Sequence, residues 1–156
     1  MAWVRSKSFT EDRGIYMNST LVDKVVKNKL EEIWVSALRN NLVDIRIYFY
    51  FPNQPEPKPT KKGIWISFKH IPKLIQAFEK LIANPEALVD VELKSDKKSQ
   101  LRTYSAKYDN KNLVHIRQFY LKAGEFAPGR GIAFPLDVLP RMIEALKKAA
   151  PLDGKV

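Results

Sequence analysis

The sequence predicts an α+β fold in which two tandem ββββα units pack as an intramolecular pseudo-dimer, each unit being a curved antiparallel four-stranded sheet with a C-terminal helix. Three observations predict it. The chain repeats itself, each copy holds runs rich in β-branched and aromatic residues, and each copy ends in an apolar pattern of helical period. With 156 residues, 45% of them hydrophobic, the chain can build one ordinary core or two small ones.

The repeat is clearest in the segment Asn-Leu-Val-x-Ile-Arg, which occupies residues 41–46 and again 112–117. These copies are 71 residues apart, whereas the Gly-Ile pairs that follow, at 63–64 and 131–132, are 68 residues apart. The first copy therefore has three extra loop residues, which loops absorb at little cost. The chain divides into an N-terminal extension, two repeats and a tail: 1–19, 20–83, 87–150 and 151–156.

The first two strands of each copy are predicted from β-rich runs at about 21–28 and 32–38, and at 88–94 and 101–108. The third strand of the first copy, residues 42–51, is rich in β-branched and aromatic side chains and stops at a proline. Alternation along this strand assigns one set of side chains to the core face: Val43, Ile45, Ile47, Phe49 and Phe51. The opposite face receives Leu42, Asp44, Arg46, Tyr48 and Tyr50.

The fourth strand is predicted at "GIWIS" in the first copy and at "GIAF" in the second. An apolar pattern of helical period follows each, at Ile71, Leu74, Ile75, Phe78, Leu81 and Ile82, and at Leu139, Met142, Ile143 and Leu146. Pro72 and Pro140 fall in the first turn of each helix, where a missing N–H costs little.

Asn84-Pro85 should end the first helix and start a short linker, residues 84–86. One helix covers only one face of a four-stranded sheet. We therefore expect the two copies to cover each other, with the helices between or beside the sheets.

The charge of the chain indicates a polyanionic partner. The formal net charge is +10 and the pI about 9.7, an excess of Lys and Arg that attracts nucleic acid or acidic membrane surfaces. Each copy carries +5, from 11 basic against 6 acidic residues in the first and 12 against 7 in the second. The basicity thus belongs to the repeat and not to a tail.

The chain lacks an apolar run long enough to span a membrane, and its N-terminus is too polar for a secretory signal. We expect a soluble intracellular protein with no membrane partner, cytoplasmic or in the nucleoid in a prokaryote or virus and nuclear in a eukaryote.

The residues give little support to catalysis, and we expect no enzyme. Zero cysteines exclude disulfides and thiolate metal sites, and two histidines, His70 and His115, are too few for a histidine-rich site. No nucleophile with its base, paired carboxylates or phosphate-binding glycine loop is visible. The sequence therefore indicates neither a metal nor any other cofactor.

Binding is better supported, because cations lie beside flat aromatic side chains on predicted strands. Arg46 shares a face with Tyr48 and Tyr50, and Arg117 with Phe119. Phosphates can be neutralised there while unpaired bases stack. The turn before the fourth strand adds Lys58, Lys61 and Lys62 in one copy and Arg130 in the other. For the aromatics off the core parity, binding and packing remain open: Trp34, Tyr48, Tyr50 and Trp65.

The order "IWVSALRNNLVDIRIYF…KPTKKGIWIS" followed by a helix, and again "YSAKYDNKNLVHIRQFY…APGRGIAF" followed by a helix, resembles the transcriptional coactivator family called positive cofactor four, which includes the yeast Sub-one protein. The resemblance spans nearly the whole chain as two copies. It implies a ββββα unit that dimerises through its helix and binds single-stranded or melted DNA along a curved sheet. The binding residues it implies are Arg39, Arg46, Phe49, Lys58, Lys61 and Lys62, and Tyr108, Lys111, Arg117, Tyr120 and Arg130.

Two features depart from that family pattern. The first copy has Ala37 or Leu38 where an aromatic is expected, and the second has a shorter turn with the single cation Arg130, so we expect unequal binding surfaces. Strand parity also assigns Phe49 and Tyr120 to the core side, where the resemblance makes them binding residues. A β-bulge or strong curvature would reconcile the two assignments.

The sequence thus predicts a sequence-tolerant single-stranded DNA-binding protein that acts in transcription, replication or repair, with Tyr48 and Trp65 as weaker candidate contacts. Melted duplex is a further possible ligand, and transcription machinery a possible partner. The alternatives are a protein-interaction module and an RNA-binding protein that uses the same surface. An exposed edge strand would allow assembly beyond the pseudo-dimer.

Overall fold

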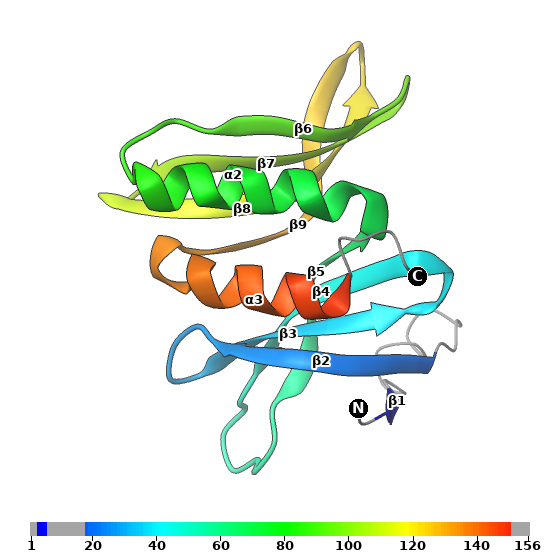
Figure 1. Ribbon diagram of the computed structural model, residues 1–156, viewed down its shortest axis with the longest axis vertical. Coiled ribbons are helices and arrows are strands. Elements are labelled where there is room, and N and C mark those ends of the chain that lie inside the picture. Colours follow the sequence, from blue (N-terminus) through cyan, green and yellow to red (C-terminus); the bar gives the residue numbers. More distant parts are fainter. Residues whose placement is uncertain (1–2, 6–17, 151–156) are drawn as a thin grey trace.

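The structure of the protein is a computed structural model that describes residues 3–5 and 18–150. Figure 1 shows two antiparallel sheets, each followed in the chain by a helix. This confirms the α+β class and the four consecutive antiparallel strands plus helix in each half of the chain. Among these residues, no helix is both long enough and apolar enough to cross a membrane.

The first sheet has five strands in the order β1-β2-β3-β4-β5. Its core is the predicted four-stranded unit, with β2 at Asn18–Val26, β3 at Glu31–Leu38, β4 at Leu42–Phe49 and β5 at Lys58–Ser67. The short strand β1, Trp3–Arg5, pairs with β2 and was not predicted.

Strand β4 is shorter than the predicted 42–51, and this shortening corrects one core assignment. The last pair between β4 and β5 joins Phe49 to Lys58. Phe51 lies beyond that pair with 46% of its surface exposed, so its placement on the core face was wrong. Pro52, Pro55 and Pro57 explain the early end, because a proline cannot donate a ladder hydrogen bond.

The second sheet has the order β6-β7-β8-β9. Its strands are β6 at Asp90–Ser95, β7 at Ser99–Tyr108, β8 at Lys111–Lys122 and β9 at Glu125–Pro135. The turn between β7 and β8 is Asp109-Asn110, whose φ angles are 53° and 63°. Two consecutive residues with positive φ match the twist of a two-residue hairpin, and Asp and Asn tolerate this region.

The helices are α2, Ile71–Ala83, and α3, Leu139–Ala149, each preceded by one 3-10 turn. Pro72 and Pro140 stand in the first turn, as predicted. The predicted apolar positions are buried with one exception: Ile82 is 42% exposed, so its assignment to the core was wrong. Helical spacing puts Ile82 on the same face as Ile75 and Phe78, but it lies in the last turn, one residue before the helix ends.

Each helix lies against the sheet of the other half. Helix α3 is close to β2 and β3 of the first sheet, α2 is close to β6 of the second, and the two helices also contact one another (Figure 1). Phe78 of α2 packs edge-to-face on Phe134 of β9, with ring centroids 6.0 Å apart. Asp23 of β2 accepts hydrogen bonds from Arg141 and Lys148 of α3. The buried core therefore contains residues of both halves.

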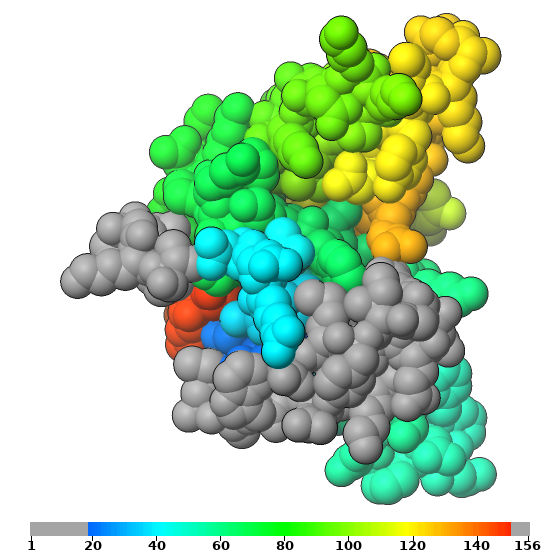
Figure 2. Space-filling model, turned by 90° about the vertical axis from the view of Figure 1, so that its right-hand side faces the viewer, coloured from blue at the N-terminus to red at the C-terminus, as the bar shows by residue number. Residues whose placement is uncertain are grey.

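The β4–β5 and β8–β9 hairpins extend away from the helices at opposite ends of the molecule (Figure 1), and they form protrusions at both ends in Figure 2. A register shift interrupts each hairpin next to its strand arginine. Residues 60–62 of β5 lie opposite the single residue Ile47, and residues 129–130 of β9 opposite Gln118. Such bulges increase the local twist and bend the hairpin.

Candidate nucleic-acid interface

The β8–β9 hairpin carries an exposed aromatic side chain, Tyr120, that packs against the backbone of the neighbouring strand. Tyr120 is 43% exposed, and its ring lies so close to Gly129 that a Cβ atom there would overlap it. Glycine is therefore required at position 129 by close packing. Arg130, the next residue, is exposed. An aromatic ring held on one face and open on the other, with a cation beside it, can stack one unpaired base near a phosphate.

The position of Tyr120 also resolves the conflict between strand parity and the resemblance. Strand β8 keeps its register with β7 through the pair Tyr120–Ser99, so Tyr120 does share the face of the buried Ile116. The bulge that was considered lies on β9 and leaves the parity of β8 unchanged. Tyr120 is exposed because the hairpin extends past the helices (Figure 1), whereas Ile116, on the same face, is completely buried.

The β4–β5 hairpin carries a weaker version of this arrangement. Phe49 is half-buried, and its ring contacts that of Phe51 edge-to-face, with centroids 4.9 Å apart. Lys58 is opposite Phe49 in the ladder, and Lys61 and Lys62 are exposed in the bulge. The first hairpin thus has more cations than the second, but its aromatic ring offers less free surface.

The strand arginines of the two halves bind the bulge of their own hairpin. Arg46 is completely buried; its Nη1 donates to the Thr60 carbonyl over 2.8 Å, and its Nη2 donates to Asp44 Oδ1 over 3.0 Å. Its guanidinium also fills the space where a side chain at Gly63 would lie. Arg117 is half-buried, and its Nη1 donates to the Gly129 carbonyl over 2.9 Å. Both arginines therefore fix the shape of a hairpin from within.

The partner of the strand arginine differs between the halves. Asp44 forms a buried ion pair with Arg46, whereas at the equivalent place His115 Nδ1 lies 3.5 Å from Arg117 Nη2. Burial, and then the Arg117 charge, lower the pKa of His115 below its ordinary value. The neutral imidazole is the form that can accept a hydrogen bond from Arg117.

The aromatic residues on the outer faces of the sheets stack on each other. Trp34 and Tyr48 are parallel with centroids 3.8 Å apart, and Tyr48 is only 7% exposed. Trp34 Nε1 and the Tyr50 hydroxyl both donate to the Glu32 carboxylate. These contacts indicate that Tyr48 is a packing residue, with little surface left for binding a ligand. Trp65, the other weak candidate, is half-buried.

Three predicted site residues lie far from the hairpin tips. Arg39 is in the turn between β3 and β4, and Tyr108 and Lys111 flank the turn between β7 and β8. Tyr108 is 73% exposed, so it is accessible. At about 3.3 Å per residue, roughly 30 Å of strand separates Lys111 from Tyr120. The predicted residues therefore form two groups in each half, one at the hairpin and one at the opposite turn.

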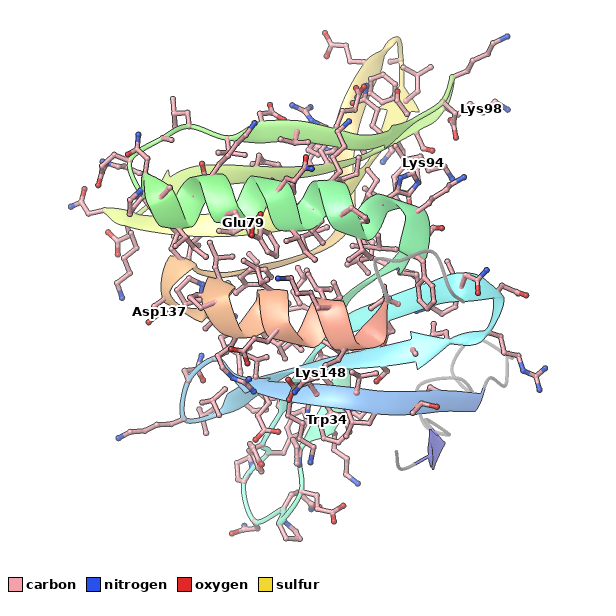
Figure 3. All side chains as sticks on the ribbon, in the orientation of Figure 1. Trp34, Glu79, Lys94, Lys98, Asp137 and Lys148 are labelled. Atoms are coloured by element: carbon pink, nitrogen blue, oxygen red, sulfur yellow. The ribbon has the colours of Figure 1, made fainter. Side chains whose placement is uncertain are left out.

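Sequence reasoning missed the lysines of the β6–β7 turn. Lys94, Lys97 and Lys98 are exposed, and Figure 3 shows Lys94 and Lys98 at the same end of the molecule. The backbone N–H of Leu121 donates to the Lys98 carbonyl over 2.9 Å, which places this turn directly beside the strand of Tyr120. The signal was the lysine-rich segment "KSDKKS", whose position beside the hairpin only the fold reveals.

Metal ligands are not grouped in the described part of the chain: it holds no cluster of three or more His, Asp or Glu side chains that could bind an ion. The sequence expectation of no metal site stays a prediction for the chain as a whole.

Comparison with known families gives one finding. Residues 94–145 match the family model described as Transcriptional Coactivator p15 (PC4). The match runs from the last two residues of β6 into α3 and includes the β8–β9 hairpin with Tyr120 and Arg130. It supports a relationship to PC4-like transcriptional coactivators, which are DNA-binding proteins, and it covers one of the two units. No curated protein matches the chain.

Proposed function

We propose that this protein binds single-stranded DNA with little sequence preference, in the manner of a PC4-like coactivator, and that it has no enzymatic activity. One observation carries the proposal: the exposed Tyr120 ring lies on the Gly129 backbone next to Arg130, within the segment that matches the family model. Stacking provides affinity without reading base identity, and cations add a salt-dependent term.

The two halves act as an intramolecular pseudo-dimer in this proposal. The resemblance implies dimerisation through the helix, and here the helices contact each other while each lies on the opposite sheet. The contact between Phe78 and Phe134 joins the halves in the core. The short linker then serves only to keep the two units together.

The two hairpins contribute unequally to binding. Tyr120 has an open ring, so the second hairpin provides the principal stacking site. Phe49 is half-buried against Phe51, so the first hairpin contributes mainly the charges of Lys58, Lys61 and Lys62. Arg46 and Arg117 shape the hairpins and are not direct contacts in this proposal.

Replacing Tyr120 by Ala tests the stacking site. Losing one stacked base should weaken binding by about 5- to 150-fold, the equivalent of about 1–3 kcal/mol. The measurement is fluorescence anisotropy of a labelled oligothymidylate titrated at several salt concentrations, with circular dichroism as the check on folding. Phe126→Ala is the matched control, because Phe126 lies on the other face of the same hairpin, paired with Leu121.

Two results would count against the proposal. One is unchanged affinity in Tyr120→Ala; the other is equal affinity of the wild type for single strands and duplex across the salt series. A matched RNA oligonucleotide in competition decides between DNA and RNA, since the stacking site as described has no group assigned to a 2′-hydroxyl.

A second candidate function is docking of a protein of the transcription machinery. The observation that favours it is the pair Leu121 and Phe126, which are 43% and 37% exposed at the tip of the β8–β9 hairpin, directly opposite each other. Capture of such a partner should survive nuclease treatment and be lost in Leu121→Ser, whereas a nucleic-acid bridge would be lost on nuclease treatment.

A further inference from the structure

A group of exposed lysines surrounds the start of helix α2. We use the name lysine junction for Lys69 and Lys73 at the start of that helix together with Lys94 on β6. All three are exposed, and none forms an ion pair with another described residue. Like charges in this arrangement repel each other, so the junction is stabilised when an anion binds.

The exchange of helices between the halves creates the lysine junction. Lys69 and Lys73 belong to the first half and Lys94 to the second, and they meet because α2 lies against β6. A bulge at Leu93 places Lys94 opposite the buried Leu101, on the helix side of the sheet. Figure 3 shows Lys94 beside the start of α2.

His70 reports the charge of the lysine junction. Burial, followed by the charges of Lys69, Lys94 and Lys73, lowers the pKa of His70 below its ordinary value of 6.5. Its Nε2 atom is buried and finds no hydrogen-bond partner among the described residues. The three lysines are therefore close enough to act on one imidazole.

The lysine junction is continuous with the proposed stacking site. Lys94 leads into the β6–β7 turn, where the Asp96 carboxylate accepts hydrogen bonds from the backbone N–H groups of Lys98 and Ser99, over 2.8 and 2.9 Å. Ser99 is opposite Tyr120 in the ladder. Exposed lysines that form no ion pair with a described residue therefore follow one another from the strand next to Tyr120, past Lys98 and Lys94, to the start of α2.

The equivalent place at the other end of the molecule has a different set of charges, in which each cation has a partner of its own. Alignment of Pro72 with Pro140 puts Asp137 at the position of Lys69, Val138 at that of His70 and Arg141 at that of Lys73. Arg141 is neutralised by ion pairs with Asp23 and Glu144. Asp137, Val138 and Arg141 line one pocket with residues 24–27, so a helix start and a sheet also meet at this end. The two lysines of that segment are engaged elsewhere: Lys27 forms an ion pair with Glu31, and Lys24 lies over the Trp34 ring.

We propose that Lys69, Lys73 and Lys94 bind phosphates of the strand that stacks on Tyr120, so that the strand crosses from the hairpin of the second half onto the helix of the first. This rests on the proposed function. Charge complementarity supports this: the junction holds three cations that form no ion pair within the described part of the chain, and the phosphate backbone is the anion that continues from a stacked base.

The test uses the full-length chain with Lys69→Gln, Lys73→Gln and Lys94→Gln combined. The control removes the same charge at three exposed lysines outside the path: Lys29→Gln, Lys80→Gln and Lys147→Gln. Labelled oligothymidylates of about 5 to about 20 nucleotides are titrated across salt. For the longer ones, the junction variant should lower the slope of log K against log salt by about 2, since each single-strand phosphate contributes about 0.7. The shortest should bind the wild type and the variant alike.

An NMR titration of the histidines in the wild-type chain gives a second readout. The chain has two histidines, so His70→Gln assigns both signals. A phosphate at the junction should raise the pKa of His70 when a long oligothymidylate is bound and leave it unchanged with a short one, while His115 serves as the internal reference.

The outcomes separate the two proposals. Wild type that binds no oligothymidylate overturns both. If Tyr120→Ala weakens binding, but the junction variant equals its control and the pKa of His70 does not move, only the phosphate path is overturned.

Discussion

Arg46 and Arg117 show how one residue type at one position of a repeat can have two energetic roles. Each donates to a backbone carbonyl in the bulge of the next strand, Thr60 in the first half and Gly129 in the second. Arg46 also neutralises the buried carboxylate of Asp44, whereas Arg117 faces His115. A buried charge left without its partner is expensive, and a neutral imidazole leaves no such charge.

We therefore predict that Arg46→Met destabilises the protein much more than Arg117→Met. The first should cost about 3–5 kcal/mol, because the buried Asp44 carboxylate loses the positive charge of Arg46. The second should cost about 1 kcal/mol for a lost hydrogen bond. Urea unfolding followed by circular dichroism measures both. Adding Asp44→Leu to Arg46→Met should recover part of the loss, and equal costs for the two single variants would contradict this account.

For single residues, the sequence predicted which face of the sheet a side chain lies on better than it predicted how exposed that side chain is. Parity correctly put Arg46 opposite the core set of Val43, Ile45 and Ile47. It could not show that Arg46 is fully buried, because that depends on Asp44, the Thr60 carbonyl and the close approach of Gly63 on the next strand. Such contacts across a ladder come from register, which alternation within one strand does not specify.

Elements of the two halves pack on each other in the core, and the contact between Phe78 and Phe134 is one place where this packing can be tested. Phe78 belongs to α2 and Phe134 to β9, and both are fully buried. We predict that each Phe→Ala change costs about 3–5 kcal/mol, as expected for a large cavity in the core. In a double-mutant cycle by urea unfolding, the pair should show a coupling of about 0.5–1.5 kcal/mol, since aromatic pairs gain beyond their buried area.

Strict additivity of the two changes would mean that the helix and the strand do not pack on each other in solution. In that case the exchange of helices between the halves would be wrong.

Most elements could be predicted from the sequence, but their partners could not. The apolar period and the first-turn prolines predicted α2 and α3, and β-branched runs predicted the strands. An apolar stripe shows that a helix is covered, but it does not show which sheet covers it. The sequence therefore could not predict that each helix lies against the sheet of the other half. Two further features were equally hidden. The early end of β4 led to the wrong assignment of Phe51, and the extension of the β8–β9 hairpin past the helices left Tyr120 in conflict.

The whole molecule should unfold as one cooperative unit, because its core is shared. All three tryptophans, Trp3, Trp34 and Trp65, are in the first half. Their fluorescence therefore reports on that half alone. We predict that Ile116→Ala, a buried change in the second sheet, lowers the urea midpoint seen by tryptophan fluorescence as much as the midpoint seen by circular dichroism.

The Ile116→Ala change should cost about 2–5 kcal/mol, which is ample for detection. A fluorescence transition that stays at the wild-type midpoint while circular dichroism shifts would show that the halves unfold separately, and it would count against the pseudo-dimer.

A chain that holds two ββββα units is free of a constraint that identical subunits impose. In a dimer of one gene product every substitution is made twice, so both ends stay alike. Here Lys69 and Asp137 occupy equivalent places with opposite charge. A nucleic-acid strand has a direction, and a two-fold symmetric protein holds it equally well either way round. A chain with two unlike ends is free of that degeneracy, so under the proposed function its geometry would distinguish the 5′ end of a bound strand from the 3′ end.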